Sequence, residues 1–209
     1  MALDIEEQQQ IEQVKKWLAE YGLTLVVAII GAIILLFGYQ RWSQMHERMM
    51  EHASVRYEQL LDNLAQNKII AADQSAAYLI KRYPHSTYAR LAELLIARRD
   101  ISLNQYADAT QKLTEVMQHG NVASLREIAR LRLARLEIQQ QQPQKALDTL
   151  KDVDANAFLA SVAAVRGDAY AALNNTAMAR QSYQQAIMGL PEAAILRSMT
   201  IMKLNNLPA

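Results

Sequence analysis

RGDAYAALNNTAMARQSYQQAIMGLP, residues 166–191, is the stretch of this sequence that most directly specifies a fold. Gly167 allows two helices to approach closely because it has no side chain. Ala179, twelve residues later, is placed to pack against it from a returning helix. An aromatic residue follows at Tyr183, and Pro191 ends the unit because proline cannot continue a helix. The stretch therefore predicts a pair of antiparallel helices.

The same pattern recurs upstream at a nearly constant spacing. The alanines equivalent to Ala179 are Ala146 and Ala109, which gives intervals of 33 and 37 residues. A weaker first copy precedes Pro84, and turn-forming sequences separate the segments at 83–86, 118–121, 140–143, 173–175 and 189–192. The apolar residues that carry the upstream copies are Leu133, Ala134, Ala146, Leu150 and Val153, then Ile96, Ala97, Ala109, Leu113 and Val116, then Ala72, Ala76 and Leu79.

These repeats resemble tetratricopeptide repeats, whose unit is a helical hairpin of about 34 residues. One hairpin cannot bury its own apolar face, so three or four hairpins must stack. Only 6 Gly and 4 Pro occur among 209 residues, which also favours helices over loops or strands. We expect an all-α chain whose residues 41–209 form a tetratricopeptide-repeat-like, right-handed helical solenoid.

Residues 23–39, LTLVVAIIGAIILLFGY, are the longest apolar stretch and carry no charge. Seventeen helical residues rise about 26 Å, close to the ~30 Å hydrocarbon core of a bilayer. The stretch predicts a single transmembrane helix over residues 22–40, with a buried core helix as the alternative. The acidic amino-terminal segment and the absence of a small-residue cleavage site argue against a removable signal peptide.

The segments that flank the apolar stretch predict how it meets the membrane surface. Residues 1–21 are expected to be a short segment that is partly an interfacial helix, with a disordered acidic tail as the alternative for residues 1–10. Four aromatic side chains are expected to anchor the helix at the headgroup layers, namely Trp17, Tyr21, Tyr39 and Trp42. Lys and Arg occur on both sides of the span, so charge alone leaves its orientation open.

The composition and motifs exclude several classes of function. Cysteine is absent, which rules out disulfides, thiol catalysis and cysteine metal sites. The net charge of +1 does not point to a polyanionic partner, and the arginine run at 126–135 is interpreted as a solvated helix face rather than a nucleic-acid site. The four histidines lack metal-ligand spacing, and no phosphate loop or nucleophile motif occurs. We expect a protein that is not an enzyme and has no cofactor or metal.

A groove is the one binding feature that the repeat pattern predicts. If the hairpins stack as tetratricopeptide repeats do, one stripe on the first helix of each hairpin lines a concave face. Arg98 and Arg135 take equivalent places in two repeats, so the groove would grip an apolar segment with an acidic group or free carboxylate. Alternatively, the apolar residues pack against the terminal helix at 195–207 or against the long first helix. The predicted groove residues are Leu91, Leu94, Arg98, Ile101, Ile128, Leu131, Arg135 and Ile138.

Beyond the repeats, the whole chain resembles the YfgM family of ancillary subunits of the bacterial SecYEG translocon. The resemblance rests on VKKWLAEYG at 14–22, RW at 41–42, LRLARLEIQQQQPQKALDTL at 131–150, the RGDAY stretch at 166–170, and MTIMKLNNLPA at 199–209. It implies a cytoplasmic amino terminus, one inner-membrane helix and a periplasmic repeat domain. It also implies association with SecYEG and with the membrane-anchored chaperone PpiD, near exported client proteins.

Two functions of different kinds follow as expectations. The resemblance implies a non-enzymatic, membrane-tethered adaptor that connects the translocon with a periplasmic chaperone. The alternative is an envelope scaffold that coordinates cell-wall or division enzymes through its repeats.

Overall fold

The computed structural model describes the chain from residue 2 to residue 208, apart from residues 154 and 155. Before residue 49, some side chains lie outside the described part. The described backbone consists of helices and connecting turns without a strand, so the predicted all-α class is confirmed. The chain divides into two units, Met1–Glu51 and His52–Ala209.

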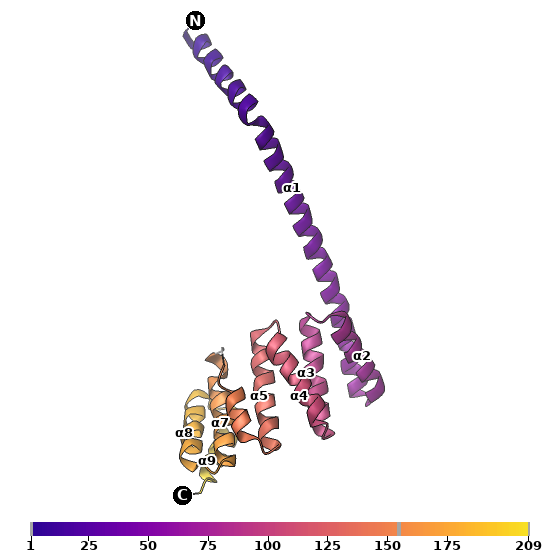
Figure 1. The fold of residues 1–209 in the computed structure, drawn as a ribbon, viewed down its shortest axis with the longest axis vertical. Coiled ribbons are helices and arrows are strands. Elements are labelled where there is room, and N and C mark those ends of the chain that lie inside the picture. The colour runs from indigo at the N-terminus through magenta and orange to yellow at the C-terminus, as the bar shows by residue number, and fades with distance from the viewer. Residues whose placement is uncertain (1, 154–155, 209) are drawn as a thin grey trace. The chain divides into compact units, whose positions relative to one another are not determined.

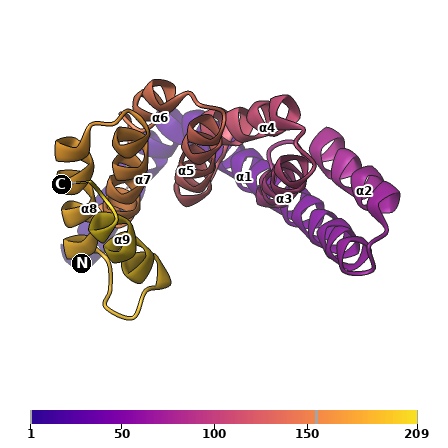
Figure 2. The same ribbon diagram turned by 90° about the horizontal axis from the view of Figure 1, so that it is seen from below.

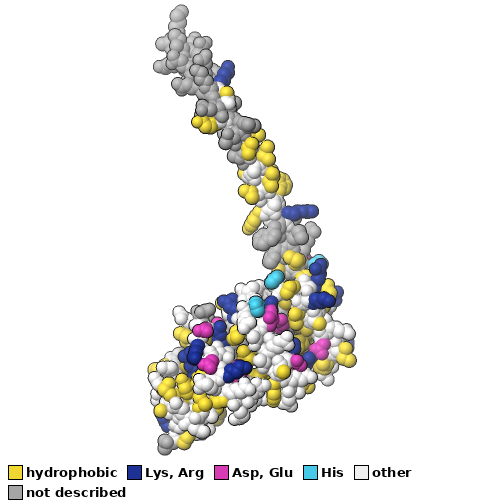
Figure 3. All heavy atoms as spheres, in the orientation of Figure 1, with side chains coloured by type: hydrophobic (Ala, Val, Ile, Leu, Met, Phe, Trp, Pro, Cys, Tyr) yellow, Lys and Arg dark blue, Asp and Glu magenta, His cyan; other side chains and the backbone are white. Residues whose placement is uncertain are grey.

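The described backbone of the first unit belongs to helix α1 (Ala2–Ala65), whose last residues belong to the second unit. Hydrophobic side chains gather along the middle of this unit (Figure 3). Leu35, Leu36 and Phe37 are exposed over 74, 68 and 70% of their surface.

The described residues hold no helix that is both long and apolar enough for a membrane crossing. The span over residues 22–40 stays a prediction, because several of its side chains, at 22–25, 28 and 29, lie outside the described part.

The second unit is a row of helical hairpins that begins with the end of α1. Figure 1 shows the helices in chain order, and Figure 2 shows α3, α5 and α7 on the inner side of a curved row with α4 and α6 outside. Each helix packs mainly on its neighbours in sequence, and α9 packs on α8. The helices are α2 (Ile69–Arg82), α3 (Thr87–Ser102), α4 (Tyr106–His119), α5 (Ala123–Gln139), α6 (Pro143–Thr149), α7 (Leu159–Ala172), α8 (Thr176–Gly189) and α9 (Ile195–Asn205), with a short 3₁₀ helix η1 (Asn156–Phe158) before α7.

Four equivalent turns define the hairpins. Asn67, Asn104, Gln141 and Asn174 have φ values of 56–61° and lie 37, 37 and 33 residues apart. After each of them, the next backbone N–H donates to the carbonyl five residues earlier at 2.8–2.9 Å. This left-handed cap ends one helix and starts the next without glycine. The weak first copy is therefore a real hairpin, formed by the end of α1 and α2.

Buried alanine and leucine side chains hold successive hairpins together. The first hairpin and α3 share a core of Ala53, Leu60, Ala72, Ala76, Leu79, Ala92 and Ile96. A second core joins α3, α4 and α5, and a third joins α5, α6 and α7. The predicted repeat alanines Ala97, Ala109, Ala134, Ala146 and Ala179 are all fully buried. Their burial confirms the spacing from which the repeats were recognised.

Gly167 allows the closest helix approach among the described glycines of this unit. A Cβ atom at this position would lie 2.4 Å from two ring carbons of Tyr183 on α8. The atoms nearest to Gly167 thus belong to the aromatic residue rather than to Ala179, which the sequence pattern had placed there. A side chain at position 167 would therefore clash with the Tyr183 ring at the present α7–α8 spacing.

Candidate interaction site in the repeat domain

The structure separates the eight predicted groove residues into two groups. Leu94 and Leu131 expose only 4 and 6% of their surface and belong to different cores. Leu91 and Ile128 pack against the α3–α5 core, and Ile138 packs against the next. Those five residues mainly hold hairpins together. The other three are Arg98, Ile101 and Arg135, which line one cavity.

The terminal helix does not cover these residues in the described contacts. Helix α9 packs on α8, where Leu196 contacts a cluster of Ala163, Ala164 and Ala186. The alternative that the groove residues pack against residues 195–207 is therefore not what the structure shows.

The cavity, which we call the arginine pocket, has a volume of about 320 Å³ and lies among α3, α4 and α5. Arg98 and Ile101 come from α3, and Leu113 comes from α4. Arg132, Arg135, Leu136 and Gln139 come from α5. The lining thus combines three guanidinium groups with three aliphatic side chains and one amide.

The three arginines are close enough to affect one another. Burial lowers the pKa of Arg132, and the positive charges of Arg98 and Arg135 lower it further. Desolvation by the surrounding protein also lowers the pKa of Arg135, even though part of this residue is exposed, and the carboxylate of Asp168 acts in the opposite direction. Arginine side chains carry a positive charge at neutral pH. The pocket therefore holds positive charge that its own lining does not neutralise.

Within the described residues, none of the ion pairs includes an arginine of this pocket. Arg132 is held in place because its Nη1 donates to the carbonyl of Leu94 at 3.1 Å. Arg98 and Arg135 are exposed at the surface of α3 and α5. Asp168 is already engaged by Lys203 Nζ at 2.7 Å and by the Tyr183 hydroxyl at 2.8 Å.

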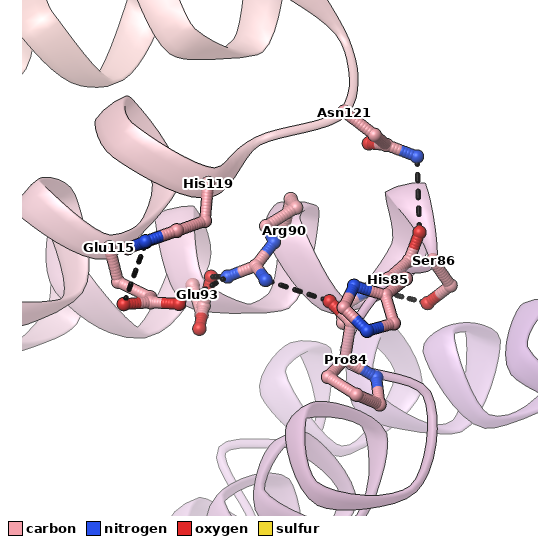
Figure 4. Close-up of polar contacts among 9 residues, drawn as sticks. Pro84, His85, Ser86, Arg90, Glu93, Glu115, His119 and Asn121 are labelled. Atoms are coloured by element: carbon pink, nitrogen blue, oxygen red, sulfur yellow. Dashed lines mark hydrogen bonds and ion pairs between the residues drawn. The ribbon is translucent and has the colours of Figure 1, made fainter.

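A second charged cluster, around Arg90, shows the opposite character (Figure 4). Arg90 Nη1 lies 2.8 Å from Glu93 Oε2 and 3.3 Å from Glu115 Oε1, and its Nη2 donates to the Pro84 carbonyl at 2.8 Å. Glu115 also lies 3.2 Å from His119 Nδ1. Each charge has an opposite charge beside it, so this cluster ties the 83–86 turn to α3 and α4.

Two further buried carboxylates, Glu127 and Glu137, are engaged by neighbouring side chains. Glu127 pairs with Arg130 at 3.2 Å, and Glu137 pairs with Lys145 and accepts from Thr149. Among the described residues, no three His, Asp or Glu side chains are grouped so as to hold a metal ion.

Sequence reasoning did not assign Arg132, Leu113, Leu136 and Gln139 to the site. The sequence pattern predicts a solvated face for the arginine run at 126–135, and this is wrong for Arg126, Arg130 and Arg132, which are partly buried. The spacing of Arg132 and Arg135, one helical turn apart, is the signal that could have joined them. Leu113 could not have been found, because it reaches the pocket from another helix.

Comparison with known proteins agrees with this architecture. A family model described as a tetratricopeptide repeat-like domain matches residues 15–209. The hairpin row and this match thus define a tetratricopeptide-repeat-like protein. Within that class, the chain belongs to the YfgM family of ancillary SecYEG translocon subunits.

Three relatives carry the family assignment. The ancillary SecYEG translocon subunit of Haemophilus influenzae is 30% identical over 99% of this chain and 100% of its own length. The protein of the same name from Escherichia coli is 29% identical over 96% of both chains. That of Neisseria gonorrhoeae is 27% identical over 99% of this chain and 100% of its own. The similarity covers the segment of α1 as well as the hairpins.

Proposed function

We propose that this protein is a non-enzymatic ancillary subunit of the Sec protein-translocation machinery. It mediates protein–protein interactions between the translocon and a periplasmic, PpiD-like chaperone for exported proteins. The observation that carries the proposal is the similarity, over nearly the whole chain, to relatives named ancillary SecYEG translocon subunits. The stacked hairpins support it, since such stacks present extended surfaces to other polypeptides.

The proposal includes an inner-membrane anchor at residues 22–40. Leu35, Leu36 and Phe37 expose most of their surface on α1, and a run of exposed large apolar side chains marks a surface that another phase or partner covers. Of the proposed interfacial anchors, Tyr21 and Tyr39 are exposed, whereas the side chains of Trp17 and Trp42 lie outside the described residues. Residues 1–21 would be cytoplasmic and residues 41–209 periplasmic, where the anchor raises the local concentration of the repeat domain.

Membrane orientation is tested with single cysteines, because the natural chain has none. We expect Gln144→Cys to react with a membrane-impermeant thiol reagent in intact cells and Ala2→Cys to react only after the cells are broken. Gln144 is exposed on α6. The Cys-free chain is the control for background labelling. The reversed pattern would place the repeat domain in the cytoplasm and refute the periplasmic part of the proposal.

The partner assignment is tested by affinity capture of the tagged full chain from detergent-solubilised envelopes. We expect SecY and the PpiD-like chaperone to be enriched at least about tenfold over a tagged, unrelated single-pass protein. Enrichment of cell-wall or division enzymes without SecY would instead establish the envelope-scaffold alternative.

A further inference from the structure

We propose that the outer face of helix α9 is an interface through which two copies of this chain pair around a twofold axis. This face, which we call the methionine stripe, consists of Ile195, Met199 and Met202. The inference goes beyond the proposed function, because the pairing needs neither the translocon nor the chaperone.

The methionine stripe lies on one side of α9 and stays outside the core. Its residues follow one another at spacings of four and three, which places them on one face of a helix. Ile195, Met199 and Met202 expose 80, 45 and 57% of their surface. A different side of α9 holds the helix to the repeat domain, where Leu196 packs on the α7–α8 cluster and Lys203 contacts α7. The stripe is therefore not used in the fold of its own chain.

The position of the stripe calls for a cover. Helices α8 and α9 lie together at the end of the row of hairpins (Figures 1 and 2). The terminal element of a stack of repeats ordinarily presents a polar outer face to water. Helix α9 presents the methionine stripe instead, and Met188, which is 79% exposed, lies at the adjoining end of α8. Grouped apolar side chains on a surface mark a site that another molecule covers.

The charge around the stripe favours a second copy as that molecule. Two copies related by a twofold axis present the same charges to each other, so a charged face would repel itself. The exposed residues beside the stripe, Ser198, Asn205 and Asn206, carry no charge. The charged residues of α9 are Arg197 and Lys203, and both bond within their own chain, at 3.3 and 2.7 Å. The face is therefore compatible with itself.

An antiparallel arrangement makes the stripe complementary to its own copy. A twofold axis near Met199 places this residue beside its counterpart and Ile195 opposite Met202. Methionine side chains are unbranched and adapt to the shape of their neighbours. A standard interface buries about 800 Å² on each partner, which is more than these few side chains supply. The pairing is therefore weak, and the paired fraction rises with protein concentration.

Single cysteines test the arrangement, because the natural chain has none. The purified full chain is oxidised in detergent micelles, and linked dimers are measured on a non-reducing gel. We expect Met199→Cys to link at least about fivefold more than Gln144→Cys on α6, because a disulfide needs Cα atoms within about 7 Å. Ile195→Cys mixed with Met202→Cys should link more than either variant alone. Equal linking of Met199→Cys and Gln144→Cys would overturn the inference.

Charged variants test whether the methionine stripe is the surface that pairs. We expect sedimentation equilibrium of the full chain in density-matched micelles to give a dissociation constant of about 10–100 µM, since interfaces below about 1,200 Å² are weak. Ile195→Lys with Met199→Lys should raise this constant at least about tenfold, because like charges would then meet across the axis.

Ile70→Lys with Leu103→Lys is the matched control, because it places charge at two exposed apolar positions on other hairpins, and it should pair as wild type does. Thermal melts of both variants should match wild type, since the replaced side chains are exposed. A wild-type chain that stays monomeric over this range, or a stripe variant that pairs as well as wild type, would overturn the inference. So would a monomeric chain whose stripe is needed to capture a different envelope protein.

Failure to capture SecY would overturn the proposed function without touching this result, because the purified chain is measured without the translocon.

Discussion

Arg90→Met is expected to lower the free energy of unfolding by about 3–5 kcal/mol, because it leaves the Glu93 carboxylate buried without its cation. Both side chains expose only about 5% of their surface, and their atoms lie 2.8 Å apart. Urea denaturation of the full chain, followed by far-ultraviolet circular dichroism, measures the loss. Arg90→Met with Glu93→Met is the control and should recover most of it, since a buried pair replaced by apolar side chains is often neutral.

The loss should also depend on pH in a definite direction. Burial raises the pKa of Glu93 above its ordinary value of 4.5, although Arg90 acts to lower it in the wild-type protein. Removing Arg90 raises the folded-state pKa further, so above pH 4.5 the unfolded chain releases a proton that the folded variant keeps. Stability then falls as pH rises through that window. We expect a smaller loss at pH 4.5 than at pH 7, and a deficit that does not change with pH would contradict the assignment to Glu93.

Gly167→Val is expected to cost about 3 kcal/mol through overpacking of the α7–α8 hairpin. The Tyr183 ring that the new side chain would meet is buried, and its hydroxyl donates to Asp168 Oδ1 at 2.8 Å. Asp168 in turn accepts from Lys203 on α9, so the ring cannot move aside without breaking contacts to two elements. The same denaturation experiment measures the effect.

The double variant Gly167→Val with Tyr183→Ala separates this mechanism from a general intolerance of α7. Removing the ring gives the valine room, so the two losses should sum to more than the loss of the double variant. Gly38→Ala is the matched control, because a Cβ atom there would meet nothing within 4 Å. Additive losses would show that the contact with Tyr183 is not the cause.

The turns between helices were predictable where the local sequence alone restricts the backbone. Pro84, Pro143 and Pro191 mark turns because proline restricts the backbone before any packing occurs. The turns at Asn67 and Asn104 were not predicted, since neither carries glycine or proline. Asn tolerates a positive φ more readily than most residues, but it also occurs throughout helices and loops. Its position becomes informative only once the spacing of all four caps is known.

The candidate site likewise combines features that the sequence predicted with features that it did not. The equivalence of Arg98 and Arg135 follows from repeat spacing, and the structure places both at one cavity. Of the predicted leucines and isoleucines only Ile101 joined them, because the other apolar residues on the stripe pack into the cores between hairpins. Whether a position on one helix face is exposed or buried depends on which other helix packs against it. A sequence pattern does not specify that other helix.

The sequence by itself determined that this chain forms paired helices in repeating units, because small and apolar residues recur at the spacing that such pairs require. It also determined the family, since the similarity runs over nearly the whole chain. Only the tertiary structure decided that Arg132 and Leu113 meet Arg98 and Arg135, and that Tyr183 rather than Ala179 lies on Gly167. The reason is physical: a cavity or a close contact depends on how separate helices pack, and that arrangement exists only after the hairpins have stacked.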